Sequence, residues 1–207
     1  VRDQGLQLMA AFEVAQSVGG DDIKGTLSSS AATITMGGTS GDARISQDYD
    51  HLWLTFSNKV NRSEYYQYCL IEFNGDNDYD YTYTSLYSNS VTAWGGTSTV
   101  YTYRETSSIR GIKGDYCAAR SESAGYFGNV QMWIPNYSNT SYFKSTISGS
   151  EISFNSDTSG RFWVSRTAGL YKDSGTAGIT QIKIKPGSLG GEFQPYTSYV
   201  LYGITGV

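Results

Sequence analysis

The chain has 207 residues and a mass of 22.7 kDa, which a single packed domain can accommodate. Its net charge of -4 and its charged fraction of 16% argue against a phosphate-backbone partner, so we expect no nucleic-acid ligand. Residues 1–18 carry Arg2, Asp3 and Glu13, and no apolar run has the length of a membrane span. We therefore expect neither a membrane segment nor an export signal.

Apolar and polar residues alternate with a period of two along most of the chain, which predicts β-strands. The first predicted strand covers residues 6–15, although this segment also has the highest helical propensity in the chain. Further strands are predicted at residues 31–36, 52–56, 68–73, 81–86, 100–103, 130–134, 142–147, 162–170, 182–184 and 199–204. Glycine-rich and asparagine-rich turns separate these strands, whereas residues 103–116 are predicted to form a polar loop.

This pattern predicts an all-β fold, a single antiparallel β-sandwich of jelly-roll-like type that covers residues 1–207. Residues 1–5 could form a short N-terminal arm. Cys69 and Cys117 are too few for a disulfide scaffold, so two buried thiols are the simpler interpretation, and a single bridge between them stays open. The predicted core residues are Leu52, Leu54, Phe56, Val130, Met132, Ile134, Ile182 and Ile184.

Few residues carry catalytic chemistry. His51 is the only histidine, and no nucleophile elbow or phosphate-binding loop occurs. We expect His51 to lie where a strand begins and to bond to a nearby backbone group. A catalytic pair of carboxylates, as glycosidases use, remains an alternative, because the fold could bring two acids together and the sequence gives no sign for or against this. We therefore predict that the protein is not an enzyme and has no cofactor.

The densest acidic cluster contains Asp76, Asp78 and Asp80 after Asn74. Alternating oxygen ligands of this kind could bind Ca²⁺, but the twelve-residue EF-hand loop is not present. The preferred interpretation is a solvated hairpin in which Asn and Asp side chains bond to turn amides. A calcium site ranks second.

Tyrosines are concentrated between residues 65 and 103. Such rings suit protein interfaces, and they suit sugar binding because a flat ring matches the apolar face of a pyranose. Ordinary packing across neighbouring strands is the third interpretation. The candidate residues for contact with a partner or a glycan are Tyr79, Tyr81, Tyr83, Tyr87 and Trp94.

Four segments, in chain order, match the motif pattern of one known protein family. Residues 45–54 resemble the family segment I-P-x-x-Y-x-x-L-x-L, with Ser46 where the family often has proline. Residues 71–76, followed by Tyr81 and Tyr87, resemble L-R-F-N-G-D…Y…L-Y, and residues 133–137 resemble a strand end with I-P-N-Y. Residues 179–204 resemble the C-terminal ending I-x-x-I-x-x-x-P-x-x-G-x-F…S-x-x-x-L-Y-G-I.

Together these segments resemble small structural proteins of tailed bacteriophages. The resemblance implies a non-enzymatic structural protein of the virion, made in the cytoplasm of the bacterial host, and it supplies no catalytic residues. Because no heptad or fibrous repeat predicts a shaft, we expect a capsid-surface decoration, cement or head-fibre protein. The alternative is a tail-fibre or spike domain that binds a receptor or a carbohydrate. The expected partners are major capsid or tail proteins, a homotrimer of this chain, and a host-surface glycan.

Overall fold

The structure is a computed structural model that describes residues 10–62, 66–76, 78, 80–90, 99–109, 111–119, 127–154, 161–172, 177–187 and 190–206. Within these residues the chain forms thirteen β-strands and one short 3-10 helix, η1 (Gly41–Ala43). The all-β prediction is therefore confirmed. No helix in the described ranges is long and apolar enough to cross a membrane.

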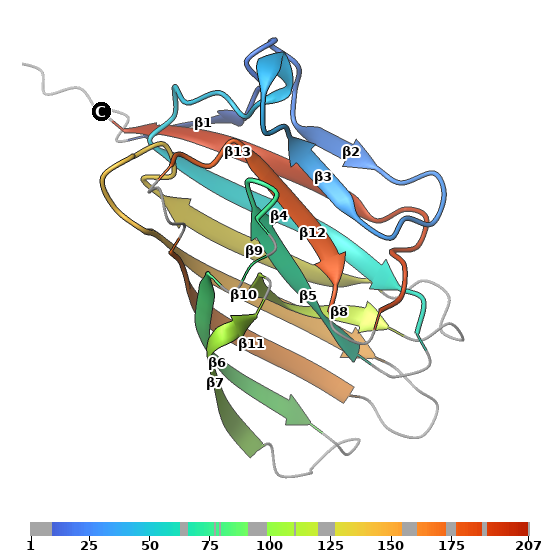
Figure 1. Cartoon of the computed structure of the whole chain (residues 1–207). Helices are drawn as coiled ribbons and strands as arrows, with labels where there is room; N and C mark the ends of the chain where they lie inside the picture. The colour runs from blue at the N-terminus through green and yellow to red at the C-terminus, as the bar shows by residue number, and fades with distance from the viewer. Residues whose placement is uncertain are drawn as a thin grey trace, which may run out of the picture.

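Nine strands form the larger of two layers (Figure 1). Its strands follow the order β13 (Ser198–Gly206), β4 (His51–Val60), β9 (Gly128–Pro135), β10 (Lys144–Phe154), β11 (Arg161–Tyr171), β6 (Tyr81–Ser90) and β7 (Thr99–Ile109). Both β1 (Ala10–Val14) and β2 (Lys24–Thr26) pair with the free side of β13. All pairings in this layer are antiparallel.

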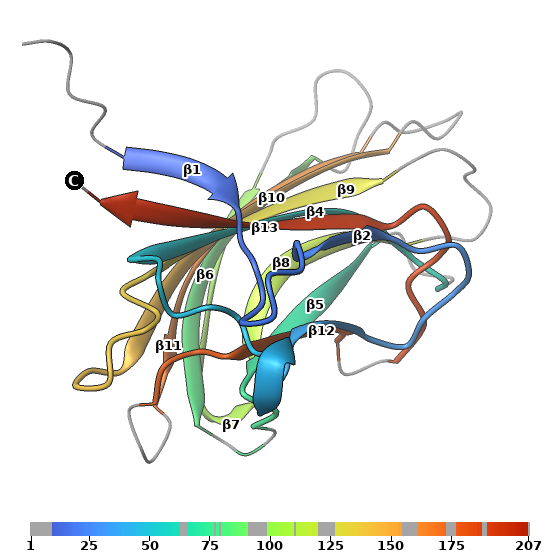
Figure 2. The same cartoon turned by 90° about the horizontal axis from the view of Figure 1, so that it is seen from above.

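The smaller layer contains β3 (Ile34–Gly37), β12 (Gln181–Pro186), β5 (Tyr66–Phe73) and β8 (Ile112–Ala119). It lies in front of the large layer in Figure 1 and below it in Figure 2. A short parallel pairing of β4 with β8, at Lys59 with Ala118 and Val60 with Ala119, joins the two layers into one mixed sheet. The strand β8 also packs against β10 and β11.

The core fills the space between the layers. Each of the eight residues predicted for the core is at most 3% exposed, so that prediction is confirmed. Alternation explains the result, because β4, β9 and β12 turn every second side chain inward. Cys69 and Cys117 are both buried thiols, and the disulfide that the sequence allowed between them is not formed.

The predicted polar loop at residues 103–116 is wrong, because this segment is the end of β7 and the start of β8. The polar character of β8 misled the prediction. Lys113 is buried, with its Nζ atom 4.0 Å from the centre of the Tyr116 ring, and such a cation over an aromatic face offsets the loss of hydration. A β-carbon at Gly114 would lie 2.6 Å from Ile71 Cδ1, so glycine allows β8 to approach β5 closely.

Candidate functional site

Residues of the four segments that carry the family resemblance contact one another. The backbone N–H of Ile45 donates to the carbonyl of Thr180 at 2.8 Å, and Gln47 Nε2 donates to the carbonyl of Ile179 at 3.0 Å. The N–H of Ile179 in turn donates to the carbonyl of Tyr137 at 2.9 Å. We call this set of contacts, together with those of Asn74, the motif junction.

Asn74 connects the second segment to the fourth. Its Oδ1 atom accepts from the backbone N–H of Thr180 at 2.8 Å, and its Nδ2 atom donates to the carbonyl of Gly178 at 3.1 Å. Its φ of 56° lies in the left-handed region, which asparagine adopts more readily than most residues. These polar groups are directed at backbone atoms, so the motif junction has a structural role.

Two of the five predicted contact residues are core residues. Tyr81 is 0% exposed and Tyr83 is 7% exposed. The Tyr81 ring stacks on Tyr171 with centroids 4.8 Å apart, and its hydroxyl accepts from the N–H of Phe73 at 2.9 Å. Their rings therefore do not form the exposed surface that the sequence predicted. Tyr79 and Trp94 lie outside the described residues.

The acidic turn after β5 has the geometry of a hairpin turn. The Oδ1 atom of Asp76 accepts from the backbone N–H of Asp78 at 2.8 Å, which is the side-chain-to-amide bond that the preferred interpretation requires. Among the described residues no group of three or more His, Cys, Asp or Glu side chains is placed to share a metal ion, and this includes Asp76, Asp78 and Asp80.

His51 begins β4, as the sequence predicted. Its Nδ1 atom accepts from the backbone N–H of Asn136 at 3.0 Å, and its ring lies 5.0 Å from the ring of Trp133. One ring nitrogen is therefore already bonded to the backbone, which confirms the predicted backbone contact.

A ladder of aromatic rings runs from the interior to the edge strand β7. Tyr87 is half-buried and stacks on Tyr101 at 5.1 Å and on Trp163 at 6.0 Å between centroids. Tyr116 meets Tyr87 edge-on at 5.6 Å. Of the predicted contact residues that the structure describes, Tyr87 is the one that reaches toward the surface.

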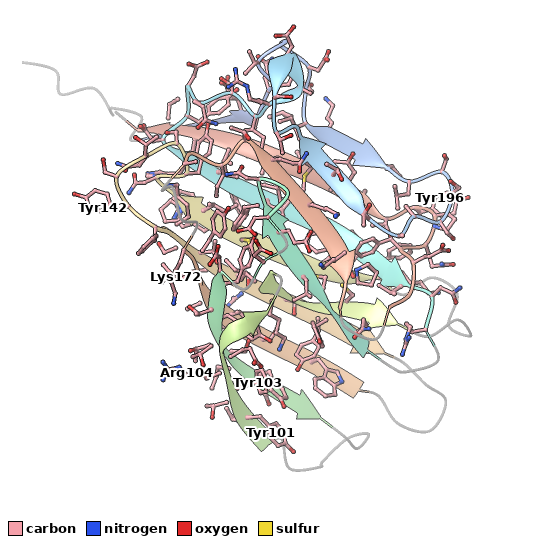
Figure 3. All side chains as sticks on the ribbon, viewed as in Figure 1. Tyr101, Tyr103, Arg104, Tyr142, Lys172 and Tyr196 are labelled. Carbon is pink, nitrogen blue, oxygen red and sulfur yellow. The ribbon has the colours of Figure 1, made fainter. Side chains whose placement is uncertain are left out.

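The outer end of the ladder lies on β7, which pairs with β6 alone among the described strands. Tyr101 is 41% exposed and Tyr103 is 46% exposed, and Val100 and Arg104 are exposed beside them. Figure 3 shows Tyr101, Tyr103 and Arg104 together on this strand. A hydrogen bond from its hydroxyl to Glu105 raises the pKa of Tyr103. We call Val100, Tyr101, Tyr103 and Arg104 the β7 edge.

A cavity of about 520 Å³ lies beside the motif junction and is lined in part by Glu13, Arg44, Asp48 and Tyr49. Asp48 accepts from the hydroxyl of Ser46 at 2.5 Å, and Tyr49 accepts from the N–H of Gln16 at 3.2 Å. Burial raises the pKa of Tyr49. The Nε atom of Arg44 donates to the carbonyl of Gly41 at 3.1 Å, so hydrogen bonds inside the fold already engage Arg44, Asp48 and Tyr49.

Comparison of the chain with family models, with curated proteins and with solved structures found no match. The resemblance to phage proteins therefore stays a prediction from the four sequence segments. The β7 edge offers exposed rings for association, and the residues of the motif junction hold backbone segments together.

Proposed function

We propose that the chain is a non-enzymatic structural domain of a bacteriophage virion with a jelly-roll-like sandwich, which decorates or cements the capsid or belongs to a head fibre. The observation that carries the proposal is the motif junction. Four segments that resemble one family, spread from residue 45 to residue 204, include residues that bond directly to one another. Such mutual contacts are what a shared fold requires, and they support the resemblance as one of the whole domain.

The polar groups at the junction support a structural rather than a catalytic role. Asn74 and Gln47 bind backbone atoms, and His51, the only histidine in the sequence, accepts a backbone N–H. General acid–base chemistry needs a titratable group. The amides of Asn74 and Gln47 do not titrate, and the Nδ1 atom of His51 accepts a backbone N–H.

The β7 edge is the surface that we propose for contact with a neighbouring virion protein or a second copy of the chain. An edge strand with unpaired backbone groups is a ready site for association. Tyrosine rings supply contact area there at low entropic cost, because they have two rotatable bonds and a polar tip. Symmetric capsids favour closed oligomers, which fits the expected homotrimer.

Cosedimentation tests the proposal. The purified chain is mixed with tailless heads and, separately, with isolated tails of the phage that encodes it. We expect saturable binding to heads, weakened at least about fivefold by the double change Tyr101→Ala and Tyr103→Ala. Tyr142→Ala is the matched control, because Tyr142 is an exposed ring on the turn between β9 and β10, away from β7 (Figure 3). Binding to tails alone would favour the fibre or spike alternative, and binding to neither would refute the proposal.

A further inference from the structure

A groove of about 310 Å³ crosses the outward face of the large layer. This face points away from β5 and β12 (Figure 2). Two rows of residues in cross-strand register line the groove. The first row is Val200, Thr55, Gln131, Gly149 and Arg166, and the second is Ser198, Ser57, Asn129 and Glu151.

Gly149 shapes the groove. It is the one position in the first row without a side chain, and the side chain of Arg166 lies over it, because a β-carbon built at position 149 would overlap the guanidinium. The φ of Gly149 is not in the left-handed region, so the strand does not need glycine for its backbone. The absence of a side chain instead leaves space that Arg166 enters.

Polar side chains of the groove have no partner within the described part of the protein. No hydrogen bond or ion pair there involves the side chains of Asn129, Gln131, Glu151 or Arg166. They offer two amides, a carboxylate and a guanidinium, so donors and acceptors lie close together. A ligand with many hydroxyl groups, each able to donate and to accept, matches this mixture.

Aromatic residues border the groove on the same face. Tyr202, Trp53 and Trp133 are aligned across β13, β4 and β9, two residues before or after the first row and hence about 7 Å from it. The rings of Trp53 and Tyr202 are 6.2 Å apart, and all three side chains are half-buried. Ile147, the next residue in this line, is 61% exposed. Apolar surface thus adjoins a polar hollow.

We propose that this groove binds a short segment of a neutral glycan. The formal charges of Arg166 and Glu151 cancel, which suits an uncharged polyhydroxylated chain better than an anionic or a cationic one. The volume lies at the lower end of the range of about 300–1,000 Å³ that ligand pockets occupy. The buried centres of protein interfaces are more apolar than their rims, whereas the lining of this groove is mainly polar.

The assignment goes beyond the proposed virion role, because it concerns a surface on different strands from the β7 edge and requires no capsid. It also differs from the tyrosine and tryptophan contacts that the sequence suggested. The two proposals can therefore fail separately.

Affinity electrophoresis of the whole chain tests the assignment. The gels contain neutral polysaccharides (dextran, galactan, mannan and a mixed-linkage glucan) or acidic ones (alginate and hyaluronan). We expect at least one neutral polysaccharide to retard the protein. Gly149→Ala, which displaces only the flexible end of Arg166, and Gln131→Ala should each weaken binding about tenfold. Thr35→Ala, at an exposed position on β3 in the other layer, is the control and should bind as the wild type does.

Circular dichroism and melting curves confirm that each variant is folded. Retardation by acidic polysaccharides alone would overturn the assignment to a neutral glycan, as would no retardation by any polysaccharide. Equal binding by the wild type and both groove variants would place the sugar elsewhere. If no glycan binds and the groove variants lose binding to heads instead, the groove is a protein contact and the assignment is wrong.

Discussion

The side-chain oxygen of Asn74 accepts a hydrogen bond from the backbone N–H of Thr180 at 2.8 Å, although 106 residues separate them in the sequence. The same oxygen accepts from the N–H of Gln181 at 3.4 Å, and the amide nitrogen of Asn74 donates to the carbonyl of Gly178. One side chain thus satisfies backbone groups of the segment that leads into β12. Without it, these backbone groups would lose these hydrogen bonds at the start of β12, next to the end of β5.

We expect Asn74→Ala to lower the free energy of unfolding by about 1–3 kcal/mol, because it leaves part-buried backbone groups without partners. Alanine also fits the φ of 56° poorly. Urea denaturation measures the change. Asn74→Gly separates the two causes, since glycine adopts this backbone conformation but has no amide. If Asn74→Gly is as stable as the wild type, the hydrogen bonds of Asn74 do not stabilise the fold.

Ile184→Ala should cost about 2–5 kcal/mol of stability, because it removes most of a fully buried side chain on a central strand of the small layer. Ile184 lies opposite Ile34 on β3 and Ile71 on β5, so the cavity would open between three strands. Thr35→Ala, at an exposed position on β3, is the control and should change stability little. A cost below about 1 kcal/mol for Ile184→Ala would mean that the small layer repacks around the gap.

The sequence revealed the strands that have one apolar and one polar face, such as β4, β9 and β12. It did not predict β8, and it gave no sign of which side chains of β10 and β11 face the interior. There, inward-facing positions hold hydroxyl residues that pair with one another, as Ser150 does with Ser165 at 2.8 Å and Thr167 does with Ser85 at 2.7 Å. A buried polar residue that bonds to a partner on a neighbouring strand is predicted from the sequence to be exposed, because the strand register is not known at that point.

The candidate sites were harder to predict for the same reason. Tyr81 reads as a surface ring because it follows a polar turn, yet it stacks on Tyr171 in the core. The groove includes Gly149 on β10 and Arg166 on β11, which are seventeen positions apart in the sequence, and it takes further residues from β4, β9 and β13. No local motif marks such a set, since it exists only in the cross-strand register.

Glu72→Gln should lower the free energy of unfolding by about 1–3 kcal/mol. Glu72 is 1% exposed on β5, and it pairs with Lys183 at 3.3 Å and with Lys185, both on β12. The two lysines keep partial contact with water. The loss of stability is therefore smaller than if the change left a fully buried lysine charge without its partner. The control is Asp22→Asn, which breaks the exposed pair with Lys24 and should change stability little. Equal losses of stability for Glu72→Gln and Asp22→Asn would contradict the expectation that the buried carboxylate of Glu72 stabilises the fold more than an exposed ion pair does.

Alkaline pH should destabilise the protein through Tyr137. This residue is fully buried, its hydroxyl donates to the carbonyl of Ser46, and burial raises the pKa of its phenol. In the unfolded chain the phenol loses its proton near pH 10, whereas in the folded chain it keeps the proton to higher pH. The unfolded state then binds fewer protons, so the stability that Tyr137 contributes is complete below about pH 10 and is lost as the pH rises above it.

The measurement is the free energy of unfolding in urea at intervals between pH 8 and pH 12, for the wild type, Tyr137→Phe and Tyr142→Phe. A single phenol of this kind contributes a slope of up to about 1.4 kcal/mol per pH unit. We expect Tyr137→Phe to be less stable than the wild type at pH 8, because it lacks the bond to Ser46, and to lose stability less steeply above pH 10. Tyr142→Phe, which removes an exposed phenol, should follow the wild-type curve. Parallel curves for all three proteins would show that Tyr137 ionises equally easily in the folded and the unfolded chain.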